Sequence, residues 1–336
     1  MKLGVVINET WSFFQEVYNH FAEHHQVTLF KHERKRSPVF EERIERYRFD
    51  HNLRTFLANK DVVFFEWSSE LLAAATRLPK TCGIVTRLHR YEMYQWVDQI
   101  QWDAVDRLIL VSQAKEREFL KRFPSQAGKT VVIPEAIDLK KFQHQPKTFG
   151  GNLGILCHLS PRKRVYELIL AFSELCALRD DLHLHIGGGP HPKFRDYAFA
   201  LESLVDRLKL QDKVTFYGPV KAPQAWYRKI DIFISNSYSE GLQVSPMEAI
   251  ASGCYCLSHD WDGANELLPG DDLYLTDQQL VRKVLQYAEL TEDEKNQRQA
   301  WQRERVCSQF DLDQIKIQIR QQVEAVAAAG PKGSLA

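Results

Sequence analysis

Two glutamates, Glu240 and Glu248, are separated by seven residues in a stretch that reads as a strand, a loop and a helix. The apolar run at 230–234 is short and β-branched, which favours a buried parallel strand. The loop after it places Glu240 beside Gly241 at the carboxyl end of that strand, where α/β sheets bind ligands. Ser245 and Glu248 predict a Ser-x-x-Glu capping box at the start of the next helix. The two carboxylates are therefore expected on either side of a helix N-terminus.

A second feature is a run of three basic residues, Arg162, Lys163 and Arg164. An apolar strand is predicted before them at 153–159, and a helix with one apolar stripe after them. A helix N-terminus carries positive partial charge and unpaired N–H groups. The turn therefore predicts an anion site that suits a diphosphate.

These stretches together resemble the retaining glycosyltransferases of family 4, which have the GT-B fold. The similarity rests on Glu240-Gly241-Leu242, on the segment M-E-A-I-A-S-G at 247–253, and on Pro161-Arg162-Lys163. The resemblance implies that Glu240 contacts hydroxyls of a donor sugar, that Glu248 holds the ribose of the nucleotide, and that Lys163 binds the diphosphate. The same chain departs from the family at two places. Gln243 stands where a glycine is common, and Cys157-His158 replaces the usual Gly-Arg, so Arg162 or Arg164 stands in for that arginine.

Further donor-binding residues follow from the resemblance. The glycines after the strand at 183–186 line the nucleotide cleft in this family, and the segment after the strand at 214–217 lies near the base. The full expected donor site consists of Arg162, Lys163, Arg164, Gly187, Gly188, Val220, Glu240, Gly241, Leu242, Gln243, Val244 and Glu248. The alternative from the residues alone is that Glu248 only caps its helix and Glu240 is a solvated loop charge.

His89 stands at the end of the apolar run 83–88. A histidine where a strand enters a cleft can donate a hydrogen bond to a substrate oxygen or act as an acid or base. Family 4 proteins often have a histidine there that faces the transferred sugar and the acceptor. The expected catalytic residues are thus Glu240, Lys163 and His89.

A chain of 336 residues exceeds what one hydrophobic core usually serves, so two domains are expected. Strands are expected at 3–7, 27–30, 62–65, 83–88, 108–111, 131–133, 153–159, 183–186, 214–217 and 230–234. Helical patterns between them give the βαβ order of doubly wound parallel sheets. No G-x-G-x-x-G follows the first strand, which counts against a dinucleotide-binding enzyme.

The expected architecture is α/β of the GT-B type: two doubly wound, Rossmann-like parallel-sheet domains facing across a cleft. We expect an N-terminal, acceptor-side domain at 1–145 and a C-terminal, nucleotide-sugar-binding domain at 146–310. A last helix within 311–336 is expected to cross back to the first domain, as is common in GT-B proteins, and to end in a tail. The number of subunits cannot be read from the sequence.

Composition excludes some partners. The formal net charge is zero, so no global attraction to nucleic acid follows. The N-terminal residues enter a strand without a long apolar segment, which predicts neither a signal peptide nor a membrane span and favours a cytoplasmic protein. The six cysteines are scattered, which favours reduced thiols.

No metal and no cofactor are expected. His183 and His185 point to one face of a strand, but no further ligands at zinc spacing accompany them, and Cys254, Cys256 and His259 supply three loosely spaced ligands at most. The expected ligands are a nucleotide-sugar donor, UDP- or GDP-linked, and a glycan, lipid-linked or small-molecule acceptor.

The segment 31–60 is rich in basic residues and carries aromatic ones. It could face an anionic acceptor or a membrane surface, which would make the protein peripheral at the inner face of a membrane. Interleaved glutamates favour the alternative, an exposed helix with i,i+4 pairs. Two rival functions also stay open: a non-catalytic nucleotide-sugar binding or scaffold protein, and another GT-B enzyme such as a sugar-nucleotide epimerase or a phosphorylase.

Overall fold

The structure, a computed structural model, describes residues 1–11, 14–33, 41–145 and 147–330. Its contacts divide the chain into two compact units. Unit 1 comprises Met1–Glu135 and Asp313–Ala336, and unit 2 comprises Ala136–Leu312. The domain bounds 1–145, 146–310 and 311–336 stay predictions. Within the segment 31–60, residues 34–40 lie outside the described part of the chain, as does the tail at 331–336.

Unit 1 is built on a six-stranded parallel sheet with the order β2-β1-β3-β4-β5-β6. Its strands are β1 (Lys2–Val6), β2 (Gln26–Leu29), β3 (Val62–Phe65), β4 (Gly83–Leu88), β5 (Arg107–Leu110) and β6 (Thr130–Val132). Its helices are α1 (Gln15–His24), α2 (Glu41–Ala58), α3 (Glu70–Thr76), α4 (Arg90–Met93), α5 (Gln113–Arg122) and α13 (Leu312–Ala329). The order reverses between β1 and β3, a type of position where open α/β sheets bind ligands.

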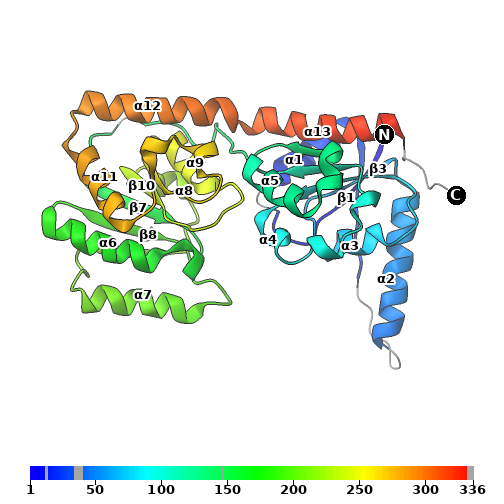
Figure 1. Cartoon of the computed structure of the whole chain (residues 1–336), viewed down its shortest axis with the longest axis horizontal. Coiled ribbons are helices and arrows are strands. Elements are labelled where there is room, and N and C mark those ends of the chain that lie inside the picture. The colour runs from blue at the N-terminus through cyan, green and yellow to red at the C-terminus, as the bar shows by residue number, and fades with distance from the viewer. Residues whose placement is uncertain (12–13, 34–40, 146, 331–336) are drawn as a thin grey trace. The chain divides into compact units, whose positions relative to one another are not determined.

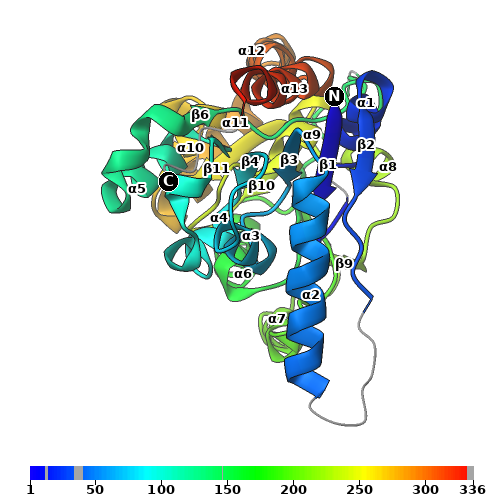
Figure 2. The same cartoon turned by 90° about the vertical axis from the view of Figure 1, so that its right-hand side faces the viewer.

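Helices cover both faces of this sheet, because alternate side chains of a buried strand point to opposite faces. Phe64 of β3 packs on Phe14 and Phe21 at α1, whereas Val63 and Phe65 join a core shared with α2, α3 and α5. Figure 1 shows α1 and α13 above the sheet and α3 below it, and Figure 2 shows the length of α2. Helix α13 approaches β4 closely because Gly83 has no side chain. A Cβ there would lie 2.5 Å from a methyl group of Val326.

Unit 2 also has a six-stranded parallel sheet, with the order β12-β11-β10-β7-β8-β9. Its strands are β7 (Asn152–Leu156), β8 (His183–Gly187), β9 (Val214–Gly218), β10 (Ile232–Ser235), β11 (Tyr255–His259) and β12 (Leu273–Tyr274). Counted from its own first strand, this is the 3-2-1-4-5-6 order of a Rossmann sheet, which reverses between β7 and β10. The loops after β7 and β10 therefore meet at the switch point, and they carry the basic turn and Glu240.

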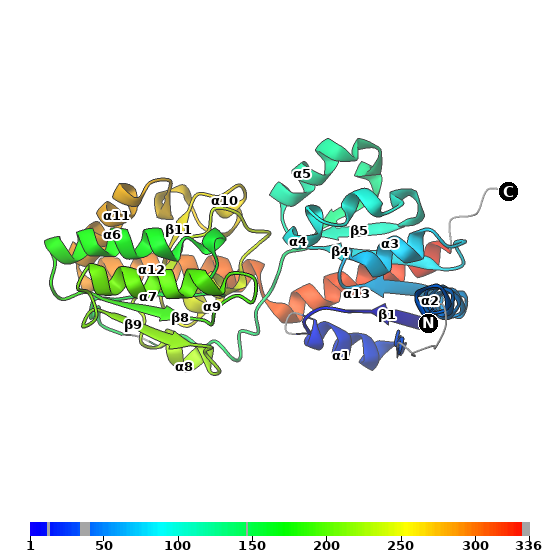
Figure 3. The same cartoon turned by 90° about the horizontal axis from the view of Figure 1, so that it is seen from below.

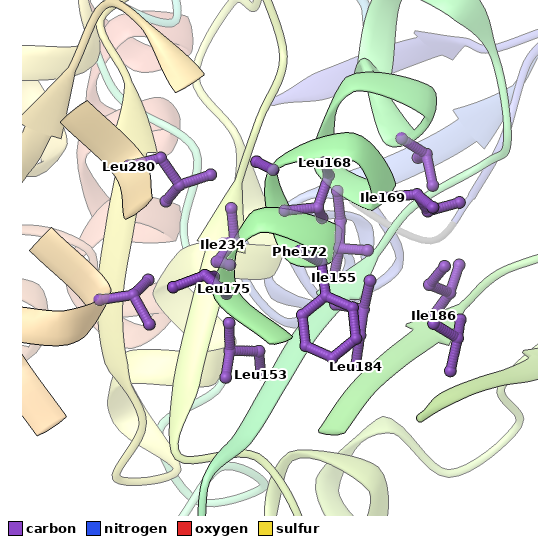
Figure 4. Close-up of a cluster of buried hydrophobic side chains, with 14 of the residues drawn as sticks. Leu153, Ile155, Leu168, Ile169, Phe172, Leu175, Leu184, Ile186, Ile234 and Leu280 are labelled. Atoms are coloured by element: carbon purple, nitrogen blue, oxygen red, sulfur yellow. The ribbon is translucent and has the colours of Figure 1, made fainter. Parts of the chain in front are cut away.

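The helices of unit 2 are α6 (Val165–Leu178), α7 (Arg195–Arg207), α8 (Pro223–Tyr227), α9 (Val244–Ala251), α10 (Ala264–Leu267), α11 (Asp277–Glu289) and α12 (Glu292–Gln309). Figure 3 shows α6 and α7 on one face of the sheet, with α12 on the other. The core under α6 interlocks Leu168, Phe172 and Leu175 with Leu153 and Leu184 of the strands (Figure 4). This packing fixes the start of α6, and so the basic turn before it.

The two doubly wound sheets predicted from the sequence are confirmed. The bounds of the six strands in unit 1 agree with the predicted ones within one residue, whereas the first strand of unit 2 ends at Leu156, three residues earlier than predicted. All six cysteines are free. None of the described helices is both long enough and apolar enough to span a membrane.

Candidate active site

The basic turn follows β7 and has a defined shape. Pro161–Lys163 form one turn of 3-10 helix, and Arg164 takes the left-handed conformation with φ of 50° before α6 begins. The Arg164 carbonyl accepts a hydrogen bond from Asn236 Nδ2 at 2.7 Å, which ties the turn to the loop after β10. A left-handed conformation is costly for a residue with a Cβ, so the neighbouring contacts must hold it.

Two of the three basic side chains converge on one carboxylate. Arg162 Nη1 and Lys163 Nζ both lie 2.6 Å from Oε1 of Glu240. Burial alone would raise the pKa of Glu240, but the charges of Lys163 and Arg162 outweigh it and lower the pKa to about 2. Glu240 is thus ionised throughout the physiological range, and its carboxylate neutralises two cations at the switch point.

Arg164 does not join this group. Its Nη2 donates to Asp277 Oδ1 at 2.9 Å, in the first turn of α11. The structure therefore brings together two of the three basic residues that the sequence placed at the donor site. A part for Arg164 in donor binding stays a prediction.

The predicted capping box of α9 is wrong. The helix begins at Val244, its N-cap is Gln243 without a side-chain capping bond, and Ser245 lies inside the first turn. The Gln243 side chain bridges strand and helix instead: Ser235 Oγ donates to Gln243 Oε1 at 2.6 Å, and Gln243 Nε2 donates to Ser245 Oγ at 3.0 Å. An amide can accept and donate at once, so Gln243 braces this loop.

Glu248 is held from the side rather than by its own helix. The fully buried Tyr227 donates its hydroxyl to Glu248 Oε2 at 2.8 Å. Burial raises the pKa of Glu248 to about 7, and the bond from Tyr227 opposes this only partly. The two glutamates thus have opposite electrostatic surroundings. Glu240 is a fixed anion, and Glu248 gains or loses its proton near neutral pH.

Loop residues between the two glutamates are mostly inaccessible. Gly241 and Leu242 are buried, and Val244 is half-buried at the helix start. They shape the loop that presents the carboxylates.

Gly187 and Gly188 permit close packing at the end of β8. A Cβ on Gly188, where φ is 117°, would lie 1.7 Å from the carbonyl oxygen of Cys157. A Cβ on Gly187 would lie 2.7 Å from Leu156 and 3.0 Å from Val220. The two glycines therefore let the segment after β8 lie directly against the end of β7, and their proposed contact with a nucleotide stays a prediction.

In unit 1, His89 belongs to a buried charged cluster, which we call the His89 cluster: Glu66, Arg87, His89, Glu92 and Glu135. His89 Nδ1 lies 2.8 Å from Glu135 Oε1, and its Nε2 lies 3.3 Å from Glu66 Oε1. Arg87 donates to Glu66 through Nε at 3.1 Å and through Nη2. The strand ends explain the meeting, because Glu66 follows β3 and His89 follows the neighbouring β4.

Sequence reasoning missed several of these partners. Glu66 and Arg87 carry no local signal, since each lies among apolar residues that read as strand. Tyr227, which positions Glu248, lies on the short helix α8 in a stretch without a recognisable motif. Glu135 follows the predicted strand at 131–133 and belongs to none of the motifs, so it carries no local signal either.

The histidines and cysteines considered as metal ligands have other partners. His185 bonds Tyr217 and Asn152, His183 bonds Thr215, and the Cys254 thiol donates to the Ile230 carbonyl at 3.2 Å. Over the described ranges, one grouping has the geometry to hold a metal: His20, Glu23 and His24 on α1. Burial lowers the pKa of His20, and so do nearby charges that include Arg320 and Lys316. The positive charges of Arg320 and Lys316 also oppose the binding of a metal cation by this group.

Comparison with known proteins finds relatives of unit 2 in sequence. Residues 150–289 match the family model described as glycosyl transferases group 1. The alpha-monoglucosyldiacylglycerol synthase of Streptococcus pneumoniae is 29% identical over 182 residues, which are 49% of this chain and 40% of that protein. The lipopolysaccharide core biosynthesis mannosyltransferase of Rhizobium meliloti is 28% identical over 156 residues, which are 41% of this chain and 43% of that protein. The chain thus spans about two fifths of the length of the curated relatives it matches.

Solved structures extend the likeness to the whole chain. HepE of Anabaena, crystallised with UDP-glucose, superposes with a TM-score of 0.77 over 97% of this chain and 100% of its own. The two sequences are 18% identical, so this likeness establishes the fold alone. The predicted two-domain, Rossmann-like GT-B fold is thereby confirmed.

Proposed function

We propose that the protein is a retaining glycosyltransferase that moves a sugar from a nucleotide diphosphate donor, UDP- or GDP-linked, to a glycan, lipid-linked or small-molecule acceptor. The convergence of Arg162 and Lys163 on Glu240 supports this best, because it sets two cations beside a carboxylate at the switch point of the unit that matches the glycosyltransferase family. Cations of this kind bind phosphate, and a carboxylate accepts hydrogen bonds from sugar hydroxyls.

In the proposed reaction, the bond between the anomeric carbon and the diphosphate oxygen breaks and negative charge develops on the diphosphate. Lys163, Arg162 and the N-terminus of α6 stabilise that charge. The acceptor oxygen then bonds to the anomeric carbon on the face that the diphosphate leaves, and its proton passes to the leaving phosphate. Glu240 holds the donor sugar, and Glu248, steadied by Tyr227, holds the ribose.

A thermal-shift screen against UDP-, GDP- and ADP-sugars identifies the donor, because a bound ligand raises the melting temperature by mass action. The best donor is then incubated with candidate acceptors, and release of the free nucleotide is followed. A transferase releases nucleotide when donor and acceptor are both present. A binding or scaffold protein would be stabilised by the donor without releasing it. An acceptor at a membrane surface, reached through unit 1, belongs to the same proposal and is tested with lipid-linked acceptors.

Activity is expected to survive chelation. Arg162 and Lys163 supply the positive charge that a divalent cation gives the diphosphate in other enzymes. Rates measured before and after treatment with EDTA should agree. Loss of activity with rescue by magnesium or manganese would contradict the proposed metal-independent mechanism.

Donor affinity is expected to increase with pH through about 7, where Glu248 loses its proton. Only the ionised carboxylate can accept hydrogen bonds from both ribose hydroxyls with both oxygens. We expect roughly tenfold tighter binding at pH 8 than at pH 6, measured by calorimetry. An intact nucleotide sugar is the right probe, since a free nucleoside diphosphate titrates its own terminal phosphate in this range.

Glu248→Gln supplies the control for this pH dependence. The variant should bind donor more weakly and with equal affinity at both pH values, while its melting temperature stays close to that of the parent because no capping box is lost. A pH dependence unchanged in the variant would place the titrating group elsewhere.

A further inference from the structure

The His89 cluster contains more acidic than basic groups, and all of them are withdrawn from water. Glu66 is 0% exposed, Arg87 2%, Glu135 6% and His89 9%. Each carboxylate of this group lies between the two basic side chains. Glu66 contacts Arg87 and His89, and Glu135 lies 2.8 Å from His89 and 3.8 Å from Arg87. With a neutral His89, two carboxylates would share one arginine. An unbalanced charge in such a place is strongly unfavourable.

Protonation of His89 removes this imbalance. Two cations then face two carboxylates, and each ring nitrogen carries a proton toward a carboxylate oxygen. The Trp67 indole lies against the imidazole with ring centroids 4.2 Å apart and an interplanar angle of 31°. An aromatic face next to the ring favours its cationic form.

We propose that Glu135 and Glu66 keep His89 as a permanent imidazolium, so that unit 1 offers its substrate a fixed cation instead of a general base. The inference rests on the proposed function for the statement that His89 meets substrate. Glu135 is the positioning residue, since its bond to Nδ1 fixes the orientation of the ring, as a carboxylate does for the histidine of a catalytic triad. The cluster thus adds Glu135 and Glu66 to the residues that the reaction needs.

The positive charge of the ring defines what His89 recognises. Nε2 is buried and lies 3.3 Å from Glu66 Oε1, whereas 11% of the side chain as a whole is exposed. A substrate oxygen with full or partial negative charge, as on a phosphate or a polarised sugar hydroxyl, suits a fixed cation at this place. The proton of the acceptor must then be taken by another group, which agrees with the leaving phosphate as base.

Burial alone would lower the pKa of His89, yet the charge and the close contact of Glu135, together with the nearby Glu66 carboxylate, raise it to about 10, against an opposing effect of Arg87. Glu92 is the group that titrates near neutrality: burial raises its pKa to about 7, while its Oε1 accepts from the Ser68 N–H at 3.2 Å. A pH effect of unit 1 near pH 7 therefore belongs to Glu92 and not to His89.

The test is an NMR titration of the full chain with 13C-labelled histidine between pH 5.5 and 8.5, the His89 signal being assigned by its loss in His89→Gln. The wild-type ring should stay an imidazolium throughout, and any small inflection near pH 7 should vanish in Glu92→Gln. A His89 that changes from imidazolium to imidazole within this range overturns the inference, whether or not the protein transfers sugar.

Variants of Glu135 give the second readout. In Glu135→Gln, Arg87 and His89 must share the single carboxylate of Glu66, which no longer balances two positive charges. His89 should therefore lose its proton within the titrated range, and kcat should fall as pH rises through that new transition. Glu135→Asp, which keeps the charge, should restore the wild-type profile. If Glu135→Gln does not fold, the wild-type titration still decides. Sugar transfer with an unchanged kcat profile in a folded Glu135→Gln also overturns the inference, whereas absence of transfer in the wild type overturns only the proposed function.

Discussion

Glu240→Gln is expected to lose sugar transfer by about 100-fold or more while its affinity for UDP or GDP does not fall. The Glu240 carboxylate neutralises Arg162 and Lys163. An uncharged amide leaves both cations for the diphosphate, so nucleotide binding is preserved or strengthened. Contact with the sugar hydroxyls is lost, so turnover of the intact donor falls. Calorimetry with the free nucleotide and turnover of the nucleotide sugar separate the two effects.

The same variant is expected to melt earlier, because it leaves two partly buried cations without their counter-charge. Arg162 is 27% and Lys163 12% exposed, so a cost of about 2 kcal/mol is expected, less than for a fully buried pair. Because the pKa of Glu240 is lowered from 4.5 to about 2, its stabilising effect is present above pH 4.5 and is lost as pH falls toward 2. The difference in melting temperature between the parent and Glu240→Gln should shrink over that interval, and pyrophosphate at pH 7 should restore more stability to the variant than to the parent.

Lys163→Ala is expected to weaken binding of UDP or GDP by about 10- to 100-fold and to leave binding of the free nucleoside unchanged. The ammonium group contacts one carboxylate and lies in the basic turn before α6, so it can meet the phosphates but has no proposed contact with the ribose. Lys141→Ala is the matched control. Its ammonium also pairs with a carboxylate, Asp138 at 3.4 Å, but its side chain is 54% exposed and lies in no predicted site.

The control should bind both ligands as the parent does, and calorimetry gives all three affinities. Equal losses for nucleotide and nucleoside in Lys163→Ala would show that Lys163 supports the whole pocket instead of contacting the diphosphate. No loss for either ligand would remove the basic turn from the donor site.

The strands are predictable from the sequence because buried parallel strands are short, continuous apolar runs between turn formers. The meeting of the basic turn and Glu240 is predictable as well, since both follow strands whose carboxyl ends lie together in a doubly wound sheet. The strand at 153–159 is predicted too long because Cys157 and Leu159 are apolar. The regular strand ends at Leu156, and Leu159 forms an isolated bridge with Pro190 before the turn at Pro161.

Side-chain partners at the site are less predictable because they depend on residues far apart in the chain. Ser245 has the right spacing for a cap, but a glutamine two residues earlier takes its hydroxyl and the helix begins before it. Arg164 is one residue from Lys163, yet the left-handed turn sends it to Asp277. Glu135 reaches His89 from 46 residues away in sequence, through a network that only the fold assembles.

Proton NMR of the complete reaction distinguishes sugar transfer with retention from every other outcome for a nucleotide diphosphate donor. The donor identified by thermal shift is mixed with protein and acceptor, and the coupling constant of the anomeric proton is followed from donor to product. We expect nucleotide to be released only as product forms, and the product to keep the anomeric configuration of the donor. A product of inverted configuration, or a donor that binds and is never consumed with any acceptor class, would contradict the proposed function.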